Sequence, residues 1–334
     1  MPYPKPLREQ VVVITGASSG MGREMAHKFA AQGAAVVLAA RNEGALEMVA
    51  LEIRQNGGTA HVVPTDVTSW DQVEMLAQEA ITVFGRIDTW INDAAVAIYA
   101  TVEETDPEEF HQLLHVNLLG TIYGSKAALA RMKAQGYGTI INFGSVLSER
   151  AVPLQAAYVA SKHGVKGFTE ALRLEVMREK LPIHVTLVLP AGVNTPFFEH
   201  ARSKIEVKPQ PLPPVYQPEA IADTVVYAAQ HPRRDLHVGG ASWMFTVLQR
   251  VSPALMDRFM LLGDIGARGQ KTKEPDEGRD NLFKPISEPG RVHGEFAHLT
   301  KPSLYARLVE MQPAWTRLVL PTVLAAGLFL LRRR

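Results

Sequence analysis

Short apolar runs alternate with helical patterns from residue 11 to about residue 240. The apolar runs are β-branched and continuous, as in strands that are covered on both faces of a sheet. They predict strands at residues 11–14, 35–39, 61–63, 87–91, 139–143, 184–189 and 236–238. The segments between them predict helices at residues 20–32, 43–55, 70–84, 155–180 and 220–230, with a further helix that begins at Asp106. Such alternation forms right-handed βαβ units, so we expect an α/β fold, a doubly wound parallel sheet in a single domain.

The pattern changes after residue 195. Five prolines between Pro209 and Pro218 exclude a regular helix there and predict a semi-rigid loop. Helical pieces at 242–262 are interrupted by Pro253, and residues 263–302 are rich in Gly, Pro and charge, which predicts a linker with little packing. We therefore expect a first domain at 1–245, a C-terminal helical extension with a Gly/Pro-rich linker at 246–312, and an apolar helix at 313–334.

The apolar helix is the candidate for membrane contact. Its uncharged part, residues 318–331, is followed by three arginines and spans about 21 Å as a helix, against about 30 Å for a hydrocarbon core. A monotopic anchor, a short tilted span, and a helix docked on this chain or on a second subunit all remain open. The N-terminus has no secretory signal pattern. We expect a cytoplasmic protein, with membrane association through residues 313–334 as the open question.

Composition narrows the classes of function. Hydrophobic residues make up 46% of the chain and charged residues 21%, which is typical of a folded globular protein. The net charge of +1 gives no field that would draw the chain to nucleic acid. The absence of cysteine excludes disulfides, thiolate metal sites and a cysteine nucleophile, and is compatible with a reducing cytoplasm. His111 and His115 have ligand spacing, but no metalloprotease pattern accompanies them, so we predict no metal site.

A glycine-rich turn joins the first predicted strand to the first helix. Its glycines let the backbone approach a pyrophosphate, and the helix N-terminus supplies free N–H groups and a positive dipole. The spacing is G-x-x-x-G-x-G, which a tight turn alone could also show, but the position at the first strand–helix junction favours a dinucleotide site. The candidate cofactor-binding residues of this turn are Thr15, Gly16, Ser18, Ser19, Gly20, Met21 and Gly22.

Arg41 follows the second predicted strand. An acidic residue at that point of a dinucleotide-binding fold takes the ribose hydroxyls, whereas a basic residue accommodates a 2′-phosphate. The sequence from Leu38 to Asn42 offers no carboxylate. We therefore expect NADP(H) as the cofactor and regard NAD(H) as the weaker candidate; the alternative for Arg41 is an ordinary solvated arginine.

Tyr158 and Lys162 are four residues apart on a predicted helix and therefore share one face. A free phenol has a pKa near 10, too high for a general base at neutral pH, and a neighbouring ammonium favours the phenolate. Ser145 ends another predicted strand, at the edge where open α/β sheets bind ligands, and its hydroxyl could polarise a carbonyl. Each feature alone is common, and the combination predicts acid/base chemistry on a carbonyl or alcohol.

With these features the chain resembles the short-chain dehydrogenase/reductase family, whose core is a Rossmann-type fold. The resemblance covers about residues 8–240 and is carried by motifs in the family's order. Besides the glycine turn these are Asp66-Val67, Asn92-Asp93-Ala94-Ala95, Asn117, Ser145, Tyr158-Val159-Ala160-Ser161-Lys162 and Pro190-Ala191-Gly192-Val193-Asn194-Thr195.

The resemblance implies a role for each matching position. The implied catalytic residues are Tyr158 as general acid/base, Ser145 as the group that polarises the carbonyl, Lys162, which lowers the phenol pKa and holds the nicotinamide ribose, and Asn117, which supports a proton-relay water. Besides the turn and Arg41, the implied cofactor-binding residues are Asp66, Val67, Asn92, Ala94, Tyr158, Lys162, Pro190, Val193 and Thr195.

The chain departs from the family pattern at two glycine positions. The family usually has Asn-Asn-Ala-Gly where this chain has Asn-Asp-Ala-Ala at 92–95, and Pro-Gly where it has Pro190-Ala191. The methyl groups of Ala95 and Ala191 stand where glycine would allow a positive φ or a close approach, which would weaken cofactor binding.

These observations lead to an NADP(H)-dependent oxidoreductase that transfers a hydride between the nicotinamide and a small-molecule carbonyl or secondary alcohol. Four aromatic residues are candidate walls of an apolar substrate pocket, with core packing as the alternative: Phe197, Phe198, Tyr216 and Trp243. The resemblance implies a homo-oligomer in which the helices around Asn117 and Tyr158 pair. The alternatives are a nucleotide-binding sensor without turnover and a membrane-recruited scaffold.

Overall fold

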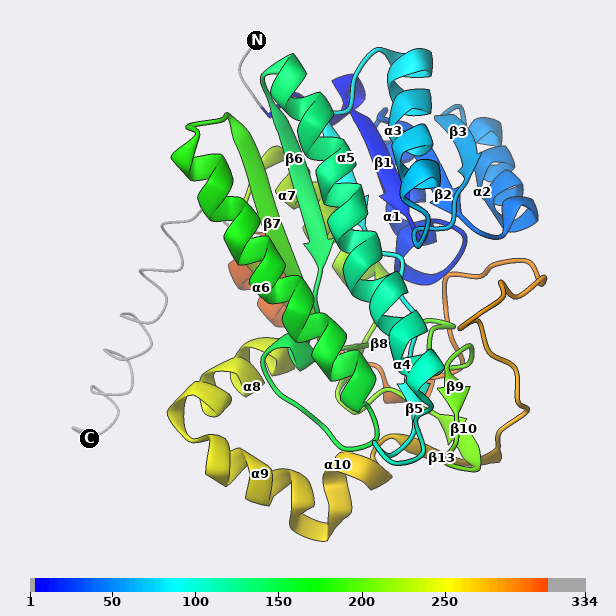
Figure 1. Ribbon diagram of the computed structural model, residues 1–334, viewed down its shortest axis with the longest axis vertical. Helices are drawn as coiled ribbons and strands as arrows, with labels where there is room; N and C mark the ends of the chain where they lie inside the picture. Colours follow the sequence, from blue (N-terminus) through cyan, green and yellow to red (C-terminus); the bar gives the residue numbers. More distant parts are fainter. Residues whose placement is uncertain (1–3, 312–334) are drawn as a thin grey trace.

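A seven-stranded parallel sheet forms the centre of the computed structural model, which describes residues 4–311 (Figure 1). The strand order is β12-β7-β6-β4-β1-β2-β3, and each neighbouring pair is parallel. This confirms the predicted doubly wound α/β fold. The strands are β1 (Val11–Thr15), β2 (Ala35–Ala40), β3 (Thr59–Pro64), β4 (Thr89–Asn92), β6 (Gly138–Phe143), β7 (Ile183–Pro190) and β12 (Asp235–Val238).

Helices cover both faces of this sheet (Figure 1). Because both faces are covered, the inner strands β1, β4 and β6 are buried along their whole length, which explains their continuous apolar sequences. Two large hydrophobic cores result, one on each side of the sheet. One face carries α1 (Gly20–Ala31), α2 (Glu43–Gln55) and α7 (Pro218–Gln230), and the other carries α3 (Trp70–Phe84), α5 (Gly120–Gln135) and α6 (Ala156–Arg178).

Helix α4 (Pro107–Leu114) begins where the sequence predicts it. Asp106 and Glu109 form a capping box, and Pro107 takes the first helical position. A short π-helix, η2 (His115–Leu119), joins α4 to α5 and contains Asn117. Single-turn π segments inside helices occur often at functional sites, because the extra residue redirects a side chain.

Short helices and strands complete the described part of the chain. Helices α8 (Gly240–Val251), α9 (Pro253–Leu261) and α10 (Ile265–Arg268) follow the sheet, with the predicted interruption at Pro253. The remaining short strands are β5 (Ile98–Tyr99), β8 (Gly192–Val193), β9 (Arg202–Ser203), β10 (Val207–Pro209), β11 (Val215–Tyr216) and β13 (Lys271–Pro275). The remaining single-turn helices are η1 (Leu7–Glu9), η3 (Val146–Ser148), η4 (Leu262–Asp264), η5 (Ala297–Leu299) and η6 (Ala306–Glu310).

The expectation of little packing over residues 263–302 is wrong. Strand β13 pairs antiparallel with β10, and the side chains of Leu282 and Phe296 are buried. The segment packs through backbone groups and a few buried or paired side chains, which a composition rich in Gly, Pro and charge conceals. The domain boundary at residue 245 remains a prediction.

Within residues 4–311, no helix is both long enough and apolar enough to cross a membrane. The predicted apolar helix at 313–334 lies outside the described residues.

Candidate active site

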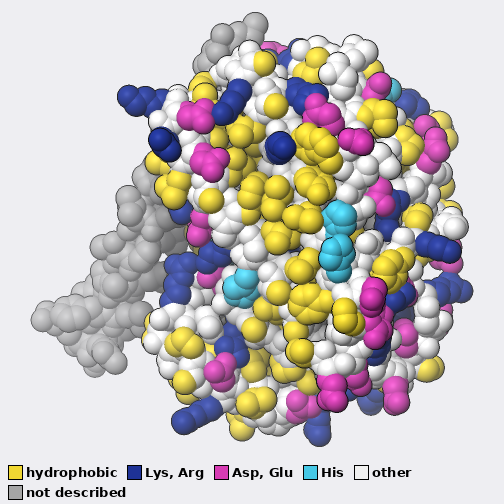
Figure 2. All heavy atoms as spheres, viewed as in Figure 1, with side chains coloured by type: hydrophobic (Ala, Val, Ile, Leu, Met, Phe, Trp, Pro, Cys, Tyr) yellow, Lys and Arg dark blue, Asp and Glu magenta, His cyan; other side chains and the backbone are white. Residues whose placement is uncertain are grey.

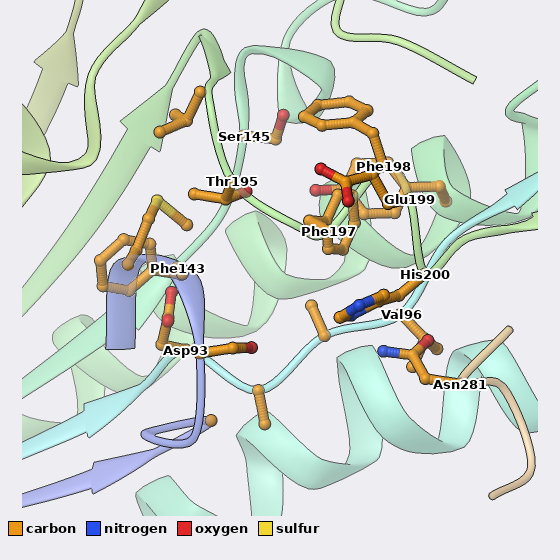
Figure 3. Close-up of a pocket in the computed structure, with 18 of the residues that line it drawn as sticks. Asp93, Val96, Phe143, Ser145, Thr195, Phe197, Phe198, Glu199, His200 and Asn281 are labelled. Atoms are coloured by element: carbon orange, nitrogen blue, oxygen red, sulfur yellow. The ribbon is translucent and has the colours of Figure 1, made fainter. Parts of the chain in front are cut away.

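A cavity of about 490 Å³ opens at the carboxyl ends of the central strands, where doubly wound sheets bind their ligands (Figure 3). Most of the predicted site residues line it. They come from distant parts of the sequence and meet because parallel strands end at one edge of the sheet. The lining residues among those predicted are Gly16, Ser18, Ser19, Gly20, Met21, Arg41, Asp66, Val67, Ala94, Ser145, Tyr158, Lys162, Pro190, Val193 and Thr195.

Three of the predicted cofactor residues, Thr15, Gly22 and Asn92, lie behind this lining and support it. The hydroxyl oxygen of Thr15 accepts from the backbone N–H groups of Asp93 at 3.3 Å and Ala94 at 3.4 Å. Asn92 is buried and donates to the side chain of Asn142 at 2.9 Å, which ties β4 to β6.

The glycine-rich turn needs its glycines for different reasons. Gly16 has φ of 80°, and a Cβ there would lie 2.9 Å from the backbone nitrogen of Ala94. A Cβ on Gly22 would strike the carbonyl group of Gly16. Helix α1 begins at Gly20 at the edge of the cavity, without a side-chain cap from Ser19; the N–H of Gly20 donates to the carbonyl of Arg291 at 2.9 Å. A helix start of this kind attracts an anionic group.

Arg41 follows β2 and turns its guanidinium toward the cavity. Its Nη1 atom is buried without a hydrogen-bond partner, whereas Nη2 donates to the carbonyl of Asn281 at 2.5 Å. Burial lowers the pKa of Arg41, and the charge of Asp66 acts in the opposite direction. A buried donor without a partner is costly, so Nη1 is suited to an anionic ligand. Together with the start of α1, it fits the phosphates of a nicotinamide dinucleotide.

Tyr158 and Ser145 meet at the cavity wall. Ser145 follows β6 and begins η3, and its side chain forms a hydrogen bond with the phenol of Tyr158. The phenol is buried, and this burial raises the pKa of Tyr158 well above its usual value, although the Ser145 hydrogen bond acts against the rise. Tyr158 is therefore protonated at neutral pH in this structure and can donate a proton.

Lys162 lies one helical turn beyond Tyr158 on α6. Its Nζ donates to the carbonyl of Phe143 at 2.8 Å and lies 5.6 Å from the centre of the Tyr158 ring. Burial lowers the pKa of Lys162 to about 8, while the charge of Asp93 acts to raise it. The sequence argument that this ammonium depresses the phenol pKa is outweighed here by burial of the phenol.

Asp93 stands where the family usually has asparagine, and the sequence did not predict it as a site residue. It lines the cavity, and one carboxyl oxygen, Oδ1, is buried without a hydrogen-bond partner. The carboxyl accepts from the backbone N–H of Gly22, and burial raises the pKa of Asp93 to about 8 despite the charge of Lys162. The change from the family's Asn to Asp was the available signal.

Asn117 supports the cavity from behind and does not line it. Its side chain donates to the carbonyl of Val96 at 3.0 Å and accepts from the N–H of Val96 at 2.8 Å. It also donates to the hydroxyl of Ser161 at 3.1 Å, on the helix that carries Tyr158 and Lys162. Asn117 therefore fixes the wall at Val96 relative to α6.

Ala95 and Ala191 line the cavity, and neither has a positive φ. Their backbones therefore do not require glycine, and the strain expected for these two methyl groups is absent. Whether the two methyl groups weaken cofactor binding through a close contact is a question for measurements of cofactor affinity.

One part of the cavity lining, hereafter the apolar end, is rich in apolar side chains, although charged residues such as Arg150 and Lys208 also line the cavity. The ring centres of Phe197 and Tyr158 are 5.7 Å apart, and the ring of Phe198 packs edge-on against that of Phe197. Further walls come from the loops and from α8 and α9, which the sequence reasoning missed because it could not orient those helices: Leu147, Val152, Leu212, Phe245 and Met260.

Two of the four aromatic candidates are not walls. Tyr216 is buried beneath Gly239, away from the cavity, and Trp243 is 48% exposed and stacks on Tyr305. His111 and His115 contact each other edge-on at 5.7 Å. In residues 4–311 there is no group of three or more His, Asp or Glu side chains placed to hold a metal ion.

Known proteins with similar sequences are oxidoreductases. The sequence is 37% identical over 278 residues to the oxidoreductase YxnA of Bacillus subtilis, covering 83% of this chain and 78% of the relative. It is 33% identical over 201 residues to a 3beta-hydroxysteroid dehydrogenase of Mediterraneibacter gnavus, covering 60% and 72%. The protein is thus an oxidoreductase. The short chain dehydrogenase model matches residues 10–206, and the chain belongs to that family.

Solved structures agree with this assignment. The alcohol dehydrogenase of the archaeon Thermococcus sibiricus, complexed with 5-hydroxy-NADP, superposes with a TM-score of 0.60 at 28% identity. The match covers 69% of this chain and 94% of that chain. The part without a counterpart in that comparison is nearly a third of the present chain.

Proposed function

We propose that this protein is an NADP(H)-dependent oxidoreductase that interconverts a carbonyl and a secondary alcohol. The observation that carries the proposal is that Tyr158, Ser145 and Lys162 line one cavity together with the start of α1. When bound, the nicotinamide supplies or accepts the hydride. The buried, unpartnered Nη1 of Arg41 supports a 2′-phosphate and so favours NADP(H) over NAD(H).

Tyr158 is the proposed general acid/base. In reduction its hydroxyl donates the proton to the carbonyl oxygen, while the Ser145 hydroxyl hydrogen-bonds the same oxygen and stabilises its developing negative charge. In oxidation Tyr158 accepts the alcohol proton. Lys162 stabilises the phenolate that forms when the proton leaves, because its ammonium lies 5.6 Å from the ring.

Asn117 acts in this proposal through the backbone. Its bonds to Val96 and Ser161 hold the cavity wall and α6 in register, so it is a positioning residue for Tyr158 and Lys162. The implied relay water at Asn117 remains a prediction.

The remaining proposed cofactor contacts follow the cavity. The turn at 16–21 and the start of α1 would hold the pyrophosphate. Asp66, Val67 and Ala94 would lie beside the adenosine, whereas Pro190, Val193 and Thr195 would lie beside the nicotinamide. Thr15, Gly22 and Asn92 support these contacts from behind.

The apolar end of the cavity supports a bulky, apolar substrate. Phe197 and Met260 lie on walls that come from different parts of the chain, and neither presents a charge to the substrate. The activity in the name of the M. gnavus relative is one on a hydroxysteroid, a substrate of the same character. We propose a hydrophobic ketone or secondary alcohol, with a ring-containing ketone as the first probe.

The family resemblance also implies a homo-oligomer, and one face of the molecule supports it. Apolar side chains gather over α5 and α6 in Figure 2. On α6, Leu174 and Met177 are each 64% exposed, and they lie one helical turn apart. We propose that two copies pair through these helices.

The test of the catalytic proposal compares Tyr158→Phe with the control Tyr123→Phe on α5. NADPH binding is followed by nicotinamide fluorescence, and turnover of a bicyclic ketone and a 3-ketosteroid by the loss of NADPH absorbance. We expect Tyr158→Phe to bind NADPH and to lose at least about a hundredfold in turnover, as for loss of a general acid. Equal turnover of the two variants would overturn the proposal.

A further inference from the structure

Residues 276–296, hereafter the strap, follow the length of the dinucleotide cavity. They are drawn in orange in Figure 1, where they run past the carboxyl ends of the central strands. Many of them line the cavity, and some contact the glycine-rich turn. The strap contacts the core at three successive places, which correspond to the adenosine, pyrophosphate and nicotinamide parts of the proposed cofactor site.

The first contact lies at the adenosine end. The Nη2 atom of Arg41 donates to the carbonyl of Asn281 at 2.5 Å, and the side chain of Asn42 donates to the carbonyl of Ile286 at 2.6 Å. The residues that follow β2 are thus held by the strap backbone, while Nη1 of Arg41 remains without a partner.

The second contact lies at the pyrophosphate position. The backbone N–H of Gly20, the first residue of α1, donates to the carbonyl of Arg291 at 2.9 Å, and the side chain of Arg23 donates to the carbonyl of Gly290. A Cβ on Gly290 would overlap the carbonyl group of Ser18. Only glycine lets the strap come this close to the turn.

The third contact lies at the nicotinamide end. The N–H of Gly294 donates to the carbonyl of Asn194 at 3.2 Å, and the N–H of Phe296 donates to the side chain of Asn194 at 2.9 Å. The ring of Phe296 is 3% exposed and packs edge-on against Phe198, which lines the cavity.

Two anchors hold the strap outside the cavity. Leu282 is fully buried in the core beside α4 and does not line the cavity. Asp280 forms a salt bridge with Arg202 at 2.9 Å. Buried and paired side chains therefore hold the strap in a defined position against the rest of the fold.

We propose that the strap is the outer wall of the dinucleotide site and has to lift for NADP(H) to enter or leave. This inference rests on the proposed function. It assigns to cofactor binding a segment beyond residue 206, where the match to the family model ends. The carbonyls of Arg291 and Asn281 accept hydrogen bonds from Gly20 and Arg41, two residues that line the cofactor site, so the strap is held directly to that site.

The test loosens the strap without touching the cavity. Leu282→Ala removes the buried anchor, and Leu304→Ala, at a leucine that is 61% exposed, is the matched control. Association and dissociation of NADPH are measured on the full chain by stopped-flow fluorescence. We expect Leu282→Ala to raise both rate constants at least about tenfold, and Leu304→Ala to leave them within about twofold of wild type.

A measurement on the unaltered protein guards against misfolding of the variant. Amide hydrogen exchange of the full chain is followed with and without NADPH. We expect the cofactor to slow exchange at Asn281, Gly294 and Phe296, whose N–H groups hold the strap to the core. Unchanged exchange there, or unchanged NADPH rates in a folded Leu282→Ala, overturns the strap alone. A wild-type chain that binds no NADPH overturns the proposed function and the strap with it.

Discussion

The buried carboxyl of Asp93 and the buried amine of Lys162 act on each other's charge inside the cavity. Burial raises the pKa of Asp93 and lowers that of Lys162, to about 8 in both cases. The acid is therefore neutral and the amine charged at neutral pH. The pair changes its charge state in the slightly alkaline range.

This relationship predicts a pH-dependent stability. The folded pKa of Asp93 lies above its ordinary value of 3.8, so its contribution to stability is complete below about pH 4 and is lost as the pH rises through about 8. Asp93→Asn keeps the shape and removes the titration. We compare the melting temperatures of the variant and the wild type at each pH. The difference, variant minus wild type, should increase by at least about 3 °C between about pH 4 and about pH 8 and stay constant above that.

Asp71→Asn, at an exposed acid in the first turn of α3, is the control and should follow the wild-type curve. Parallel curves for wild type and Asp93→Asn would show that Asp93 does not titrate in this range.

Arg41 predicts the cofactor preference. Its buried Nη1 is available to a phosphate, and a charge-assisted hydrogen bond contributes about 1.5–3 kcal/mol, or roughly ten- to a hundredfold in affinity. We expect Arg41→Ala to weaken NADPH binding by that factor and to change NADH binding little, as measured by parallel titrations. Arg54→Ala on α2 leaves the cavity intact and is the control. Equal losses for both cofactors would refute a 2′-phosphate contact.

Met260 predicts where an apolar substrate lies. Its side chain is 3% exposed and lines the cavity, whereas the neighbouring Leu261 is 68% exposed on the same helix. Met260→Ala removes wall surface, so we expect KM for a hydrophobic ketone to rise about tenfold while the Kd of NADPH stays the same. Leu261→Ala should leave both unchanged. If Met260→Ala alters only NADPH binding, the apolar end serves the cofactor.

The exposed apolar face of α6 predicts the oligomeric state. We expect the wild-type chain to be at least a dimer by light scattering, and Leu174→Glu to shift it toward the monomer, because a charge would be buried at the interface. Val83→Glu on α3, at a valine that is 46% exposed, tests whether any added surface charge has this effect. A monomeric wild type would contradict the pairing.

The sequence predicted the elements that follow simple periodicity. Helices α2 and α3 begin and end at the predicted residues, because Asn42 and Ser69 cap their starts and their apolar faces repeat regularly. Strand β4 begins two residues later than predicted, since Ile87 is buried before the strand pairing starts. The positions of Tyr158, Lys162 and Ser145 at one cavity follow from the order of the parallel strands.

The strap could not be predicted in the same way. Its contacts use backbone carbonyls, as at Asn281 and Arg291, and backbone groups leave no trace in residue type. The apolar wall at Met260 was missed for a related reason. A helix pattern gives a buried face but does not say which neighbour covers it.

The strap also affects the order in which a working site can form during synthesis. Arg41 and its partner Asn281 are 240 residues apart, so their contact waits for almost the whole chain. The sheet, whose last strand ends at Val238, can fold on the ribosome before residue 281 is made. A nascent chain would then present an open crevice, and tight retention of the dinucleotide would begin only when translation is nearly complete.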